Sequence, residues 1–219
     1  MLISCSTLEQ ASLHGFNSGF YTLKDGEKVR KVYVDVADPK INIYYREEKA
    51  VPMKPLRSIH LEKSDSLGVT SLKFRKQSLD IDLTTIFFKY RPSVFGLPQQ
   101  LTSDLNISLY AGWRNDHYKI ASSTDPLGRA YSKLSNLGYD FGVFAGTGSA
   151  AVSPFSTNYR TINDYTGMIF QTGVAGFLEF KFTSFGVSVG LDNLLNEDRK
   201  IWVYNKKPWI GFIAGIALN

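Results

Sequence analysis

The chain has 219 residues, a net charge of +5 and a single cysteine, Cys5. This length suits one β domain or a small domain joined to a larger one, and a lone cysteine excludes a disulfide within the chain. No run of about eighteen apolar residues is present, which excludes a membrane-spanning helix. Lysines and arginines are scattered along the chain, so the sequence shows no cluster of basic residues of the kind that binds nucleic acid.

The first segment, residues 1–15, is predicted to be a polar tether. Residues 2–5 read LISC, with Leu2 three positions before the cysteine and Ser4 directly before it. This is the pattern of a bacterial lipobox, so Cys5 is a candidate for lipidation. Only four residues precede Cys5, fewer than a signal peptide needs. A chance match, with a free thiol at a frayed N-terminus, is the alternative.

Residues 16–46 are predicted to form a small β-meander. Asp25-Gly26 is a hairpin signal between two β-rich runs, and a third β-rich run follows Asp38-Pro39. About 30 residues hold little core of their own. The next segment contains prolines and mixed charges, so residues 47–65 are predicted to be a linker.

Residues 66–219 contain longer segments in which apolar and polar residues alternate, as they do on the two faces of a strand. In DLNISLYAGWRN, residues 104–115, Leu105, Ile107 and Leu109 share one face while Asn106 and Ser108 share the other. The same alternation recurs in residues 78–90, 136–148, 168–182, 184–193 and 209–219.

The connections between these segments are of two kinds. Some are short, such as residues 75–77, and others, such as residues 122–133, run to about a dozen residues. No segment has the pattern of a long helix. Together these features predict an all-β fold, an antiparallel up-and-down membrane β-barrel of about eight strands.

Three features favour lipid over a protein core as the partner of the apolar faces. The opposite faces combine charges with glycines, as in a narrow lumen, and the segments are about ten residues long or longer. Aromatic residues gather near segment ends, including Phe88, Tyr90, Trp113, Tyr118 and Trp209. The predicted lumen charge network comprises Asp80, Asp82, Arg114, Asp140, Glu179, Lys181 and Asp192.

An interior of about eight strands is only wide enough for side chains. We therefore expect these charges to neutralise one another and fill the lumen, with a conducting pore as the less favoured interpretation. The alternative fold is a soluble β-sandwich or lipocalin-like barrel, in which the apolar faces line a core.

The lipobox-like LISC, the meander FNSGFYTLKDGEKVRKVYVDV and the glycine-rich strands ending in PWIGFIAGIAL resemble small outer-membrane β-barrel proteins of Bacteroidota-type bacteria. The resemblance is architectural and covers residues 66–219. No family motif accompanies it, so it assigns no functional residue.

Few residues suggest chemistry. The three histidines, His14, His60 and His117, lack metal-ligand spacing, and Cys5 has no partner, so we expect neither a zinc site nor another cofactor. His117 and Ser122 are the weak candidates for a lipid-modifying enzyme, but no nucleophile elbow is present. A structural histidine near a strand end is the favoured interpretation.

The sequence therefore predicts a non-catalytic structural or interaction component of the bacterial envelope, located in the outer membrane. Its expected partners are outer-membrane lipid and other envelope proteins, with no nucleic acid. The alternatives are a lipid-modifying barrel enzyme and a soluble, lipid-anchored ligand-binding β domain.

Overall fold

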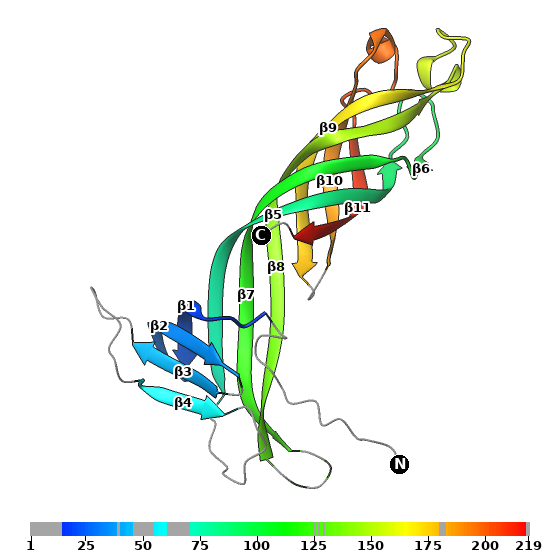
Figure 1. Ribbon diagram of the computed structural model, residues 1–219. Coiled ribbons are helices and arrows are strands. Elements are labelled where there is room, and N and C mark those ends of the chain that lie inside the picture. The colour runs from blue at the N-terminus through cyan, green and yellow to red at the C-terminus, as the bar shows by residue number, and fades with distance from the viewer. Residues whose placement is uncertain are drawn as a thin grey trace, which may run out of the picture. The chain divides into compact units, whose positions relative to one another are not determined.

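The computed structural model of the chain describes residues 15–38, 40–45, 55–60, 71–124, 126, 128, 130–179 and 183–217 (Figure 1). These residues form eleven β-strands and two 3-10 helices, Phe155–Thr157 and Glu197–Lys200. The prediction of an all-β chain without long helices is thus confirmed for the described residues. Among them, no helix has the length and apolar character needed to cross a membrane.

The chain divides into two compact units. Unit 1 comprises Met1–Gln77 and Asn115–Gly138, and unit 2 comprises Ser78–Arg114 and Tyr139–Asn219. Three long strands contribute residues to both units: β5 (Leu72–Arg91), β7 (Asn106–Thr124) and β8 (Ala130–Val152). The predicted boundaries of tether, meander, linker and barrel stay predictions.

The three long strands extend past the turns that the sequence predicts. Residues 75–77, predicted as a short turn, lie inside β5, and β7 continues to Thr124 within the predicted loop 122–133. β5 and β7 are neighbours in the sheet, and the side chains of Arg75 and Gln77 both donate to Asn115 Oδ1 on β7, each at 2.9 Å. The predicted turn at residues 75–77 is therefore wrong, because these polar residues belong to a strand.

Unit 1 contains an antiparallel meander of β1 (Gly19–Asp25), β2 (Lys28–Ala37), β3 (Lys40–Tyr45) and β4 (Arg57–His60), and β1 also pairs with β5. The predicted hairpin is confirmed, since the two-residue loop after Asp25 places Gly26 at φ 60°, a conformation that favours glycine. β4 falls inside the segment predicted as a linker, where Ile59 is the one apolar residue of the strand that the core buries.

The buried side chains of unit 1 form an apolar core. Phe16 is completely buried, and its ring lies 4.9 Å from Tyr21, 5.2 Å from Phe74 and 4.8 Å from Tyr118, measured between centroids. Valines of β2 and isoleucines of β3 and β4 complete the core. The charged side chains of β1 and β2 are exposed or half-buried, so unit 1 has the ordinary arrangement of a water-soluble protein.

Burial raises the pKa of Tyr21 to about 12, a change that the backbone of Asn17 opposes and the charge of Asp116 reinforces. The unfolded chain loses this proton near pH 10, whereas the folded chain keeps it until about pH 12. We therefore expect the free energy of unfolding to fall between pH 10 and 12, by an amount on the order of 2 kcal/mol.

The Tyr21→Phe variant isolates this effect. Thermal unfolding midpoints of the two proteins, measured from pH 8 to 12, should run parallel below pH 10 and diverge above it, with the wild type falling faster. Parallel curves up to pH 12 would contradict the assignment.

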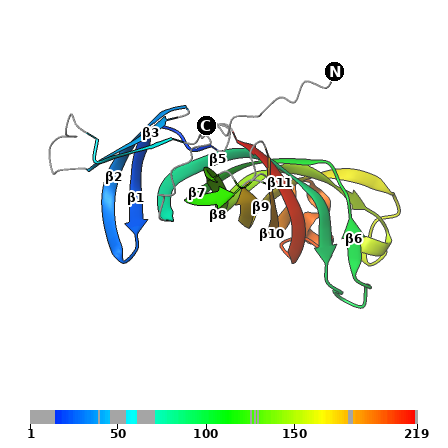
Figure 2. The same ribbon diagram turned by 90° about the horizontal axis from the view of Figure 1, so that it is seen from below.

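Unit 2 is built on a closed ring of six antiparallel strands (Figures 1 and 2). The ring adds β9 (Tyr165–Glu179), β10 (Ser184–Leu194) and β11 (Pro208–Ala217) to the long strands, in the order β5-β7-β8-β9-β10-β11, and β11 pairs with β5. The short β6 (Gln100–Thr102) pairs with β5. The prediction of about eight strands is wrong, because β11 pairs with β5 and closes the ring at six.

The two faces of the ring carry opposite kinds of side chains, as the alternation predicts. Polar residues at alternate positions are buried, whereas large apolar residues between them are exposed. The exposed apolar residues include Leu79, Ile81, Leu83, Phe87, Ile107, Leu109, Trp113, Phe141, Val143, Met168, Val174, Leu178, Val187, Val189, Ile210 and Ile216. Two of the aromatic residues that the sequence places near segment ends are not on the outer face of the ring, since Tyr118 lies in the unit 1 core and Trp209 is buried inside unit 2.

A β-bulge in β5 changes which of its residues point inward. Phe212 of β11 pairs with Phe88, but the next residue, Ile213, pairs with Ile86, so Phe87 is the extra residue. Phe87 and Phe88 are therefore both exposed, and Lys89, which strict alternation would place outside, is buried.

Candidate functional site

The ring interior of unit 2 holds two clusters of charged side chains. The first, termed the acidic cluster, comprises Asp80 and Asp82 of β5, Arg114 of β7, Asp140 of β8 and Glu179 of β9. Arg114 Nη1 lies 3.5 Å from Asp80 Oδ2 and 3.1 Å from Glu179 Oε2. The side chains of Asp80 and Glu179 are each only 4% exposed, so these ion pairs are largely shielded from water.

Neutral donors reach two of the carboxylates. Ser184 Oγ donates to Asp82 Oδ2 at 3.2 Å, and the Tyr110 hydroxyl donates to Asp140 Oδ1. Other oxygens of the acidic cluster are buried without a hydrogen-bond partner, namely Asp80 Oδ2, Asp82 Oδ1, Asp140 Oδ2 and Glu179 Oε1. One oxygen each from Asp80, Asp82 and Glu179 lies within 4.8 Å of the others, a spacing that a shared metal ion could use.

The second cluster, termed the basic cluster, centres on Asp192 of β10. Lys89 Nζ lies 3.0 Å from Asp192 Oδ1, and Arg91 forms an ion pair with Asp192 Oδ2. Trp209 Nε1 also donates to Asp192 Oδ1 at 2.9 Å, and Lys89 donates to Gln171 Oε1 at 2.8 Å. Asp192 is completely buried, and each of its oxygens has a cationic partner.

The structure places the predicted lumen charges in two groups rather than one. Asp80, Asp82, Arg114, Asp140 and Glu179 meet in the acidic cluster, whereas Asp192 belongs to the basic cluster. Lys181 lies outside the described residues.

Sequence reasoning missed Lys89 and Arg91, which the bulge turns inward. The sequence does contain a signal for this bulge, the consecutive Phe87-Phe88. Two adjacent apolar residues in an alternating strand indicate that the inward and outward positions shift by one residue.

Aromatic side chains and glycines fill the space around the clusters. Trp209, Phe144 and Phe177 are buried in the ring. A Cβ atom on Gly190 would overlap the Trp209 ring, and one on Gly142 would overlap the backbone of Ala111 and Gly112. Glycine thus allows a narrow ring to enclose large side chains, in agreement with the glycine-rich inner face predicted from the sequence.

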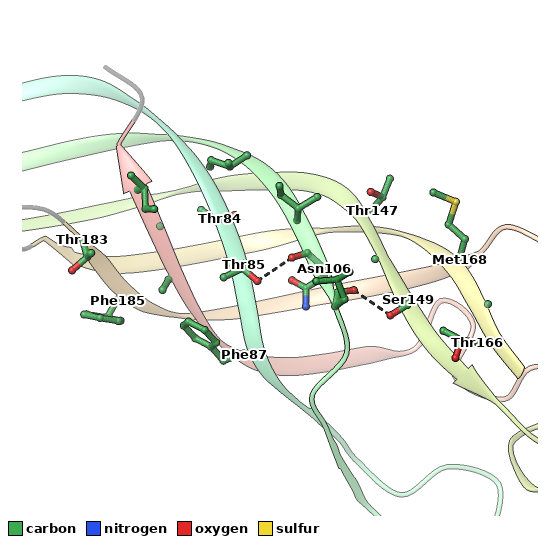
Figure 3. A pocket seen from close by; sticks show the side chains of 18 residues that line it. Thr84, Thr85, Phe87, Asn106, Thr147, Ser149, Thr166, Met168, Thr183 and Phe185 are labelled. Atoms are coloured by element: carbon green, nitrogen blue, oxygen red, sulfur yellow. Dashed lines mark hydrogen bonds between the residues drawn. The ribbon is translucent and has the colours of Figure 1, made fainter.

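An apolar groove of about 810 Å³ lies on unit 2 and is lined by residues of all six ring strands (Figure 3). Exposed Leu83, Phe87 and Phe185 are among its lining residues. Two lining hydroxyls donate to backbone carbonyls, Thr85 to Asn106 at 2.9 Å and Ser149 to Leu105 at 3.3 Å. Hydroxyls bonded in this way do not require water, which suits an apolar surrounding.

The other candidate residues do not assemble into a site. His117 and Ser122 are both exposed on β7 in unit 1, and five residues of extended strand separate them by about 16 Å. Asp116 is buried whereas the adjacent His117 is exposed, so the two side chains occupy opposite faces. Cys5 lies outside the described residues.

Comparison with known proteins found no matching protein-family model, curated protein or solved structure. The function of the chain is therefore argued from its geometry.

Proposed function

We propose that this protein is an integral membrane β-barrel whose six-stranded ring spans a lipid bilayer. The observation that carries the proposal is the inverted arrangement of unit 2, with charged and polar side chains buried inside the ring and large apolar side chains exposed around it. A monomer in water rarely exposes so much apolar surface. A closed ring leaves no unpaired strand edge in hydrocarbon, as a membrane-spanning sheet requires.

The change of arrangement along single strands supports the proposal. In the unit 1 part of β5, Leu72 and Phe74 are buried while Lys73 and Arg75 are exposed; in the unit 2 part, Asp80 is buried. β7 changes in the same way, since Ile120 is buried whereas Ile107 is exposed. If water surrounded the whole strand, apolar side chains would be buried along its entire length. Water around unit 1 and lipid around unit 2 explain why apolar side chains are buried in one part and polar side chains in the other.

We further propose that the protein is a non-catalytic structural or interaction component of the bacterial outer membrane. Antiparallel β-barrels with an apolar outer face and a polar interior are found in outer membranes, and the lipobox-like LISC agrees with that location. Aromatic side chains and paired charges fill the ring, which favours a scaffold over a pore. Outer-membrane lipid is the expected partner of the outer face, and other envelope proteins are expected partners of the loops and the meander.

Expression and refolding of the full chain test the proposal. We expect the chain to be insoluble when made without detergent and to refold in detergent to a β-rich form. This form should migrate differently on a gel before and after heating, as closed membrane barrels do. The heated sample and a refolding reaction without detergent are the controls. A monodisperse, folded protein in plain buffer would refute the membrane function.

A further inference from the structure

We infer that the acidic cluster inside the ring binds one hard divalent cation of the calcium class. The inference depends on side chains inside unit 2 and is independent of what surrounds the ring.

The first argument is geometric. Asp80, Asp82 and Glu179 each offer a carboxylate oxygen, and these oxygens lie within 4.8 Å of one another. Calcium binds oxygen at about 2.3–2.6 Å, so its ligands lie up to about 5 Å apart. Carboxylates without nitrogen or sulfur ligands select hard cations such as Ca²⁺ and Mg²⁺ over transition metals.

The second argument is that the cluster contains buried acceptors without partners. Asp80 is 3% and Asp82 1% exposed, yet Asp82 Oδ1 has no hydrogen-bond partner and Asp80 Oδ2 has no hydrogen bond beside its long ion pair, at 3.5 Å, with Arg114. Asp140 Oδ2 and Glu179 Oε1 are also buried without a hydrogen-bond partner. A buried carboxylate oxygen without a partner is strongly destabilising, and a shared cation satisfies several such oxygens at once.

The third argument is charge. Arg114 forms ion pairs with Asp80 and Glu179, and among the described residues it is one cation in a cluster of four carboxyl groups, those of Asp80, Asp82, Asp140 and Glu179. The basic cluster of the same ring differs, because Asp192 is matched there by Lys89 and Arg91 and also accepts from Trp209. Among the described residues, the acidic cluster is thus the part of the ring interior where carboxyl groups outnumber cations.

The position of the site gives the ion a structural role. Asp80 and Asp82 lie on β5 and Glu179 lies on β9, and these two strands occupy opposite places in the ring order. They share no backbone pairing in that order, so a bound cation joins two walls of the ring that the sheet itself does not connect.

Calcium binding to the full-length protein tests the inference. Protein refolded with a chelator and then dialysed is titrated with CaCl₂ while the thermal unfolding midpoint and equilibrium dialysis are followed. We expect one calcium per chain and a saturable rise of the midpoint. The Asp82→Asn variant should bind calcium at least tenfold more weakly, and its calcium-free form should be no less stable than the wild type, because a like charge is removed.

Glu179→Gln provides a second variant if Asp82→Asn fails to fold, and Asp164→Asn, at an exposed loop position, is the matched control that should bind as the wild type does. No calcium uptake by the wild type would overturn the inference, as would uptake that both cluster variants retain. Stabilisation by acid alone, without any effect of calcium, would also overturn it and identify protons as the neutralising groups. The titration can be performed in detergent or in buffer, so its failure is distinct from failure of the membrane function.

Discussion

Replacing Asp192 by alanine is expected to cost about 3–5 kcal/mol of folding free energy and to abolish most refolding. Lys89 Nζ and the Arg91 guanidinium both bind this carboxylate, and all three residues are almost completely buried. Without Asp192, two buried cations lie close together and Trp209 Nε1 loses its acceptor. The yield of the heat-sensitive folded form and the denaturant midpoint measure the loss.

Asp164→Ala is the control for this substitution, because Asp164 is exposed and should be replaceable with a change within about 0.5 kcal/mol. Adding Lys89→Met to Asp192→Ala should restore part of the stability, since it removes one unpaired charge. A wild-type midpoint for Asp192→Ala would refute the assigned basic cluster.

Replacing Val187 by arginine is expected to destabilise the protein by about 2–4 kcal/mol in lipid vesicles. Val187 is 60% exposed, and its strand neighbours across β10 are Gly176 of β9 and Phe212 of β11. In water an arginine at such an exposed position would be nearly neutral. The loss of stability arises only if this face of the ring contacts hydrocarbon, so the substitution tests directly whether lipid surrounds the ring.

Val29→Arg is the matched control, because Val29 is the same residue type and is 61% exposed, but lies on β2 of unit 1. We expect this substitution to change the unfolding free energy in vesicles by less than about 0.5 kcal/mol. Equal effects at the two valines would contradict a lipid-facing ring.

The sequence predicted those features that depend on neighbours along the chain. Alternation in residues 104–115 correctly assigned exposed Ile107 and Leu109 and buried Asn106 and Ser108, because side chains of a strand alternate whatever the strand pairs with. The hairpin at Gly26 was predictable for the same reason, since its turn needs only local residues.

Features that depend on pairing across the sheet were not predictable in this way. Closure at six strands follows from pairing of β11 with β5, which joins segments more than a hundred residues apart in the chain. The inward position of Lys89 follows from the bulge at Phe87, which exists only relative to β11. The division of the charges into two clusters likewise depends on which strands lie opposite one another.

The pairing of β1 with β5 has a consequence for self-association. β11 pairs with β5 from Asp82 to Tyr90, whereas β1 pairs with the stretch from Leu72 to Arg75. Without β1, the backbone amides and carbonyls on this side of Leu72–Arg75 would be open to a strand of another molecule. β1 of the meander therefore covers the part of β5 that extends beyond the pairing with β11. In this way the meander keeps that stretch of β5 from pairing with a strand of another molecule.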